Sequence, residues 1–221
     1  MSKFNSYAKK VDEIAKAAFE EYRKAEKALN DAQKKADNMP AYKVGMPREY
    51  NTLQYEAKRA QAQADVLQAK ENLRKAKTEY AKHLDEIKAL RSDLEADLNN
   101  HYAADPAALD SNTLELLKSG LLKTNEYDKL MNDAEAAGNY TMARMIAKYA
   151  GDAAAEFGRR YGENSAQART LRAISYKANE YNGKDTLDAF DGLTEVYSRS
   201  VNNPAMIDHW GELTGDIVEN M

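Results

Sequence analysis

The 221-residue sequence contains no cysteine, which excludes disulfide bonds, thiol catalysis and cysteine metal ligands. Nine of its ten glycines follow Arg91, so the first ninety residues have few of the residues that interrupt helices. No stretch approaches eighteen apolar residues, and no run alternates in the way that β-strands do. These absences predict an all-α protein without a membrane-spanning segment.

Sequence motifs of catalytic and metal sites are also missing. His83, His101 and His209 are far apart, with no HExxH motif and no repeated ExxH motif around them. The sequence has no Gly-x-Ser-x-Gly turn and no glycine-rich phosphate loop. Acidic pairs such as Asp152 and Glu156 have the spacing of a solvated helix face. We therefore expect no enzyme activity, no metal and no cofactor.

The first helix is predicted to extend to Asp37 with one alanine-rich apolar stripe, whose members recur every three or four residues. The stripe consists of Phe4, Ala8, Val11, Ala15, Ala18, Tyr22, Ala25, Leu29, Ala32 and Ala36. Small side chains allow a partner helix to approach closely, but they bury little area per residue. Such a helix needs a long partner to be stable.

The predicted partner is the long stretch from Arg48 to about Asn99, which contains no proline or glycine. Its first apolar stripe comprises Leu53, Ala57, Ala60, Ala64 and Leu67, and a second stripe begins at Leu73. The shift of phase near Val66 indicates a change of partner along the helix. We expect an antiparallel coiled-coil hairpin in which the first helix covers the first two-thirds of the second.

The last third of the long helix carries large apolar side chains that the first helix is expected to be too short to cover. These residues are Leu84, Ile87, Leu90, Leu94 and Leu98. Burying one of them is worth roughly 1.5–3 kcal/mol, so the stripe requires a partner. Either the C-terminal region folds back on it or a second chain does, and self-association through this stripe is the favoured prediction.

The remaining residues are cut into short helices by glycine, proline and capping residues. They predict a small bundle of five or six helices. The expected organisation is a hairpin over residues 1–99, a linker over 100–111 and a C-terminal helical bundle over 112–221.

Charge is distributed unevenly along the chain, whose net charge is −4. Residues 141–179 carry a net charge of +4, and residues 180–221 carry −7. The basic residues of the first segment are Arg144, Lys148, Arg159, Arg160, Arg169, Arg172 and Lys177, with Tyr149, Tyr161 and Tyr176 among them. Pairing with the acidic end, internally or between subunits, is the favoured role, ahead of a protein partner and of nucleic acid.

One segment resembles helical proteins encoded by bacteriophages and prophages of Gram-positive bacteria. The resemblance rests on residues 119–122, on Glu126 and Tyr127, and on residues 138–146. A coiled hairpin joined to a small helical domain is also similar in plan to phage scaffolding proteins. Those commonly end in a basic helix-turn-helix, whereas this chain ends in an acidic helix. The resemblance implies an assembly protein and no particular site residues.

The functional expectation is a non-enzymatic helical interaction protein that acts in phage head or tail assembly through self-association. The alternatives are a phage-encoded inhibitor of a host protein and a nucleic-acid-binding accessory that uses the basic segment. Because the first residues lack the apolar run of a signal peptide, a cytoplasmic location is expected, within the host cell or associated with the virion. Membrane binding is not expected, since the hairpin lacks clustered lysine and arginine.

Overall fold

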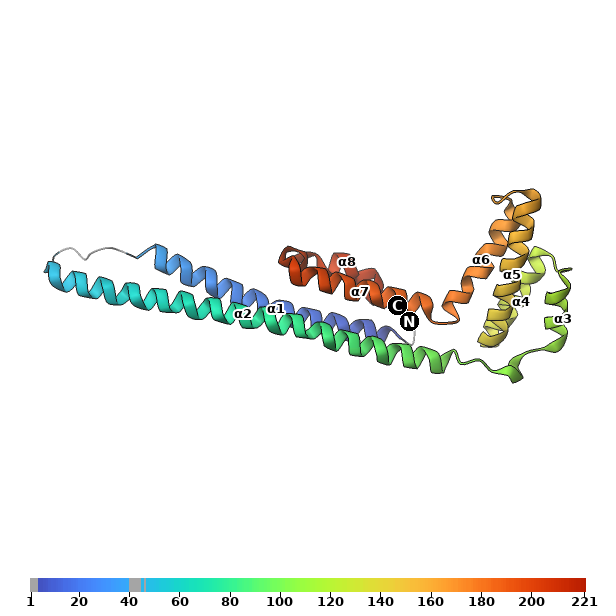
Figure 1. The fold of residues 1–221 in the computed structure, drawn as a ribbon, viewed down its shortest axis with the longest axis horizontal. Coiled ribbons are helices and arrows are strands. Elements are labelled where there is room, and N and C mark those ends of the chain that lie inside the picture. Colours follow the sequence, from blue (N-terminus) through green and yellow to red (C-terminus); the bar gives the residue numbers. More distant parts are fainter. Residues whose placement is uncertain (1–3, 40–44, 46) are drawn as a thin grey trace. The chain divides into compact units, whose positions relative to one another are not determined.

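The computed structural model describes residues 4–39, 45 and 47–221, and every regular element in that range is a helix (Figure 1). The all-α prediction is thus confirmed. The elements are α1 (Asn5–Asp37), α2 (Arg48–His101), η1 (Pro106–Ala108), α3 (Ser111–Ser119), α4 (Thr124–Ala136), α5 (Tyr140–Tyr161), α6 (Ala166–Glu180), α7 (Lys184–Asn202), η2 (Pro204–His209) and α8 (Trp210–Asn220).

The chain divides into two units. The terminal unit combines residues 1–90 with residues 192–221, and the central unit comprises residues 91–191. These boundaries lie within α2 and within α7, and the division into residues 1–99, 100–111 and 112–221 stays a prediction. The sequence could not indicate the boundaries within α2 and α7, because the last thirty residues join the first ninety through contacts that are distant along the chain.

The terminal unit is built around an aromatic cluster. The Phe19 ring of α1 lies 5.5 Å from the Tyr80 ring of α2 and 5.4 Å from the Trp210 ring of α8. Tyr197 of α7 stacks on Tyr80 at 4.8 Å and on Phe19 at 6.1 Å. Such aromatic pairs each contribute about 0.5–1.5 kcal/mol beyond the area that they bury. The cluster therefore joins four helices at one level.

Helices α1 and α2 run in opposite directions in the terminal unit (Figure 1). Tyr22 lies beside Tyr80, at 6.3 Å between ring centroids, whereas the end of α1 at Asp37 lines a groove with Arg59 of α2. The contact of α1 with α2 thus begins only after the first turns of α2. We expected α1 to cover the first two-thirds of α2, and this register corrects that expectation. Large aromatic side chains fix this register, because an alanine seam alone fits several registers almost equally well.

Helix α8 lies along α1 and holds both chain ends together. Asn5 Nδ2 donates to the Glu219 carbonyl oxygen at 2.9 Å, and Trp210 Nε1 donates to Asp12 Oδ1 at 3.0 Å. Arg23 forms an ion pair with Asp208 at the start of this segment.

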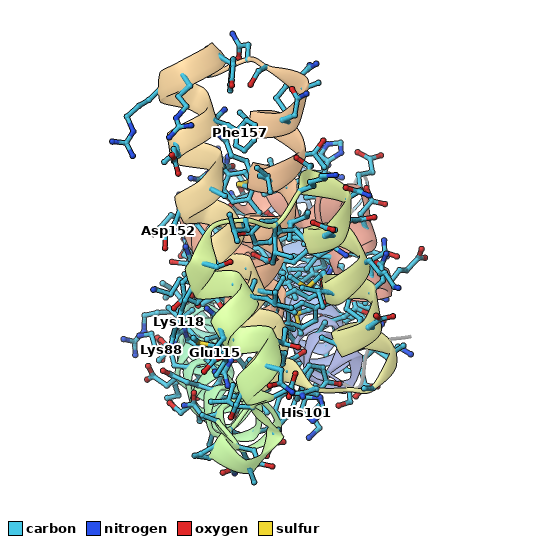
Figure 2. All side chains as sticks on the ribbon, turned by 90° about the vertical axis from the view of Figure 1, so that its right-hand side faces the viewer. Lys88, His101, Glu115, Lys118, Asp152 and Phe157 are labelled. Atoms are coloured by element: carbon cyan, nitrogen blue, oxygen red, sulfur yellow. The ribbon has the colours of Figure 1, made fainter. Side chains whose placement is uncertain are left out.

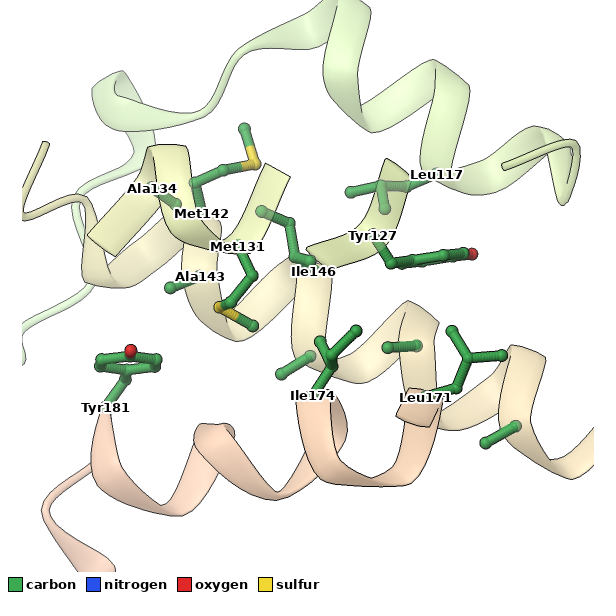
Figure 3. Packing of buried hydrophobic residues seen from close by; sticks show 13 residues of the cluster. Leu117, Tyr127, Met131, Ala134, Met142, Ala143, Ile146, Leu171, Ile174 and Tyr181 are labelled. Atoms are coloured by element: carbon green, nitrogen blue, oxygen red, sulfur yellow. The ribbon is translucent and has the colours of Figure 1, made fainter. Parts of the chain in front are cut away.

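The central unit packs α4, α5 and α6 around aliphatic, methionine and alanine side chains. Figure 3 shows Met131 of α4, Ile146 of α5 and Ile174 of α6 in one layer, all nearly inaccessible to solvent. Gly151 allows α6 to approach α5 closely, since a β-carbon there would lie 2.7 Å from Ser175 Oγ. Leu117 of α3 completes this core.

Side chains at the predicted breaks stabilise the helix ends of the central unit. Asn139 Oδ1 accepts from the Met142 amide at 3.0 Å, and Ser165 Oγ accepts from the Ala168 amide at 3.4 Å. Helix α3 begins at Ser111, because Asp110 accepts from the Thr113 amide at 2.9 Å. Gly120 then ends α3 in the left-handed conformation, with φ of 66°.

Candidate interaction surfaces

The five large apolar residues at the end of α2 do not form an exposed stripe. Ile87, Leu94 and Leu98 are fully buried, and Leu84 and Leu90 are partly buried. Within the central unit, Leu98 touches Gly183 just before α7, where a β-carbon would lie 2.9 Å from Leu98 Cδ2. Of the two coverings that the sequence left open, burial within one chain is the one seen here, and self-association through these residues stays a prediction.

Charge pairing also joins α2 to α7 in the central unit. Arg91 Nε donates to Asp191 Oδ1 at 2.6 Å, and Arg91 Nη2 donates to Asp191 Oδ2 at 3.0 Å. This two-point hydrogen bond to the Asp191 carboxylate raises the pKa of the Arg91 guanidinium. The C-terminal region thus returns along the end of α2, which is the alternative that the sequence had left open.

The apolar stripe that is exposed lies at the other end of α2. Leu53 and Leu67 are 67% and 66% exposed, and Tyr50 is 50% exposed. Ala57, Ala60 and Ala64 are exposed between them. On a helix that advances about 100° per residue, these six positions share one face, roughly 180° from the buried Val66 and Ala69. Among the described residues, the exposed stripe Tyr50–Leu67 is a candidate interaction surface of the terminal unit.

The sequence contained this stripe but assigned it to the wrong face. Its residues were expected to contact α1, whereas α2 instead buries Val66, Ala69 and Tyr80. The shift of phase near Val66 was a usable signal, because a helix with two apolar faces can fill only one of them with a single partner.

A groove adjoins the exposed stripe at the end of α1. It has a volume of about 530 Å³ and lies between Ala36 and Met39 on one side and Ala62 and Leu67 on the other. Leu67 belongs to both the groove and the stripe, so the two features form one continuous surface.

The basic segment of α5 and α6 is paired within its own unit. Lys148 approaches Asp152 at 3.9 Å and lies over the Tyr149 ring at 4.7 Å. Asp152 projects from the outer side of α5, well separated along the helix from Phe157 (Figure 2). Lys177 donates to Glu135 at 2.5 Å. Burial raises the pKa of Glu135, but hydrogen bonds from Lys177 and Tyr181 outweigh it and lower that pKa.

The arginines of this segment are likewise held locally. Arg160 pairs with Glu156, and Arg172 pairs with Glu163. Arg144 and Arg159 donate to carbonyl oxygens one turn back in α5, both at 3.4 Å, and no ion pair is recorded for Arg169 in the described part of the chain. The partners of these side chains therefore lie within the central unit, and the predicted pairing of the segment with the acidic end stays a prediction.

The acidic residues of the chain end have other partners. Asp191 pairs with Arg91, Asp208 with Arg23, and Glu195 with Arg199 one turn along α7. Most of the ion pairs of the basic segment, and one of those at the acidic end, thus form within the segment itself.

Buried hydroxyl groups of the terminal unit form a polar cluster beside a cavity. Tyr80 and Ser200 share a hydrogen bond beside a 310 Å³ cavity, and Tyr197 donates to the Tyr80 carbonyl oxygen at 2.9 Å. Burial raises the pKa of Tyr80 to about 12. Ser200 is also hydrogen-bonded to the Tyr197 carbonyl oxygen at 2.6 Å and contacts no general base, so this cluster is structural.

No group of three potential metal ligands occurs in the part of the chain that the structure describes. His83 and His209 each contact one glutamate, at 3.0 Å to Glu86 and 2.9 Å to Glu212. His101 instead belongs to an aromatic cluster with Tyr102 and Tyr140. Across residues 4–39, 45 and 47–221, none of the helices combines the length and the apolar character needed to cross a membrane.

Comparison with known proteins gives no further assignment. No protein-family model, curated protein or solved structure matches this chain. The functional argument therefore rests on the surfaces described above.

Proposed function

We propose that this protein is a non-enzymatic helical interaction protein whose binding surface is the exposed face of α2. The observation that carries the proposal is the apolar stripe Tyr50–Leu67, which is exposed and lies roughly 180° around α2 from the buried Val66 and Ala69. Sustained apolar residues three and four apart are typical of a helix that pairs with another helix. Exposed apolar stripes on otherwise charged helices mark sites of protein association.

In this proposal α1 and α2 form a coiled-coil hairpin that presents the stripe at a distance from the aromatic cluster. The ring contacts of Tyr22 with Tyr80 and the groove between Asp37 and Arg59 support an antiparallel pair. The resemblance of residues 119–146 to phage proteins places the role in particle assembly. It is a part of the proposal that rests on sequence alone.

Photo-cross-linking in the native cell tests this function. A photoreactive amino acid replaces Leu53 in one variant and Leu67 in another, and both should give covalent adducts of higher mass after illumination. The matched control carries the same amino acid at Glu79, which is exposed farther along α2 and outside the stripe. Absence of adducts from both stripe positions, or equal adducts from the control, would overturn the proposal.

A further inference from the structure

The residues that flank the exposed stripe specify what can pair with it. In heptad notation Tyr50, Ala57 and Ala64 occupy position a, and Leu53, Ala60 and Leu67 occupy position d. The flanking e positions are all glutamine, at Gln54, Gln61 and Gln68. The flanking g positions are Glu49, Glu56, Gln63 and Lys70.

We infer that the partner is a second copy of this chain, which packs its own α2 stripe against the first in antiparallel orientation. This inference rests on the proposed function, because it names the occupant of the same surface. Placing Ala57 opposite Ala60 of the other copy sets Leu53 against Ala64 and Leu67 against Tyr50. Each layer then pairs a large residue with a small one, or two small ones, except at the two ends.

Charge complementarity supports this orientation. Antiparallel pairing brings g positions of the two helices together, so Glu49 faces Lys70 of the second copy and Glu56 faces Gln63. By symmetry each of these pairs occurs twice, and no like charges meet. On the other flank Gln54 faces Gln61, and amide groups can hydrogen-bond to one another.

The parallel alternative lacks these pairs. Position g of one helix would then face position e five residues later in the other, which sets Lys70 against Lys75 and leaves Glu49 without a cation. It would also place the two Tyr50 rings in one layer. Charge and side-chain size both favour the antiparallel pair.

The existing fold leaves room for the second copy. Helix α1 packs on the face of α2 that buries Val66 and Ala69, roughly 180° from the stripe. The groove beside Leu67 widens the contact on the side of Lys70, which lines it together with Gln63. Glu49 and Lys70 are both exposed, so they are accessible to the second copy.

Spin labels on the purified full-length chain measure the orientation, since the absence of native cysteine allows single-site labelling. A label at Asn72→Cys should lie about 40 Å along the helix axis from its counterpart, because the two positions are offset by 27 residues. A label at Lys58→Cys should lie almost level with its counterpart. A parallel dimer would give similar short separations at both positions, and a monomer would give no defined distance; either result overturns the inference.

Charge reversal provides the second measurement. Glu49→Lys and Lys70→Glu should each weaken the dimer about tenfold, because two attractive pairs become repulsive, and the double variant should restore wild-type affinity. Analytical ultracentrifugation supplies the dissociation constants. Additive losses in the double variant would contradict the assigned register.

A third measurement separates this inference from the proposed function. Leu53→Glu combined with Leu67→Glu should reduce the dimer to a 24.8 kDa monomer in light scattering, whereas Lys58→Glu, exposed on the same segment but outside the stripe, should leave the dimer intact. Should the wild-type chain remain a monomer while Leu53 and Leu67 still cross-link in cells, the inferred partner is wrong and the proposed function stands. If the wild-type chain is a monomer and neither Leu53 nor Leu67 cross-links in cells, both proposals are wrong.

Discussion

The two units of this protein reach a buried core by different means. The central unit is contiguous in sequence, and its core combines α4, α5 and α6 through aliphatic, methionine and alanine side chains. The terminal unit brings both ends of the chain together around Phe19, Tyr80, Tyr197 and Trp210. The core of the central unit relies on many contacts between small side chains of neighbouring helices. The core of the terminal unit relies on a few contacts between large aromatic side chains that are distant in the sequence. A single substitution in the aromatic cluster of the terminal unit should therefore reduce stability more than a single substitution in the central unit.

The largest effect is expected from Phe19→Ala. The ring contacts three other aromatic side chains, and truncation of a buried phenylalanine costs about 3–5 kcal/mol. Urea denaturation followed by fluorescence measures this loss, because Trp210 is the only tryptophan and lies in the same cluster. Tyr176→Ala, at an exposed position of the central unit, is the control and should change stability by less than about 0.5 kcal/mol.

The next effect is expected from Gly183→Ala in the central unit. Gly183 has a φ of 75°, and its β-carbon would collide with Leu98, so the substitution should cost about 2 kcal/mol. Gly211→Ala is the matched control, because nothing lies within 4 Å of the added carbon and alanine favours helix α8. Thermal denaturation followed by circular dichroism should show opposite shifts for the two variants. Equal shifts would contradict the close contact at Leu98.

A smaller effect is expected from Asn139→Ala. The Asn139 side chain caps α5 and also donates to the Ala108 carbonyl oxygen at 2.7 Å. Losing both hydrogen bonds should cost about 1–2 kcal/mol. Ser165→Ala removes only a cap at the start of α6 and should cost less. Urea denaturation followed by circular dichroism compares the two, and a greater loss for Ser165→Ala would refute the additional role of Asn139.

The smallest expected effect is the pH dependence of stability that the titration of Tyr80 causes. Burial holds its folded pKa near 12 against 10.0 for a free tyrosine, so the neutral side chain is favoured in the folded state. The contribution of the neutral Tyr80 side chain to the free energy of unfolding is fully present below about pH 10. It is lost as pH rises toward about 12. Stability measured by Trp210 fluorescence should fall less steeply with pH in Tyr80→Phe. An identical slope in both proteins would show that Tyr80 does not titrate as expected.

Local features of the fold were predictable from the sequence. Asp37, Gly120, Gly138 and Gly162 mark helix ends or follow them directly, because backbone and capping chemistry act within a few residues. The organisation into units was not predictable. It depends on Trp210 reaching Phe19 and on α7 returning along α2, and no periodic pattern encodes which distant faces meet.

The candidate surface was predictable only as a pattern of residues. The stripe from Leu53 to Leu67 was visible, and so was the shift of phase after it. Its exposure required the register of α1 against α2, which the aromatic contact between Tyr22 and Tyr80 determines. A sequence shows that a helix has two apolar faces, but three-dimensional contacts decide which one remains open.

The hydrogen bond from Asn5 to the Glu219 carbonyl oxygen has a consequence for biosynthesis. The two partners of this bond are 214 residues apart in the sequence, so the face of α1 that meets α8 stays uncovered until α8 has been synthesised. The central unit is synthesised in one continuous stretch and can fold while the chain is still growing. During synthesis the face of α1 that carries Asn5, Asp12 and Phe19 is therefore open to other contacts until the residues of α8 follow.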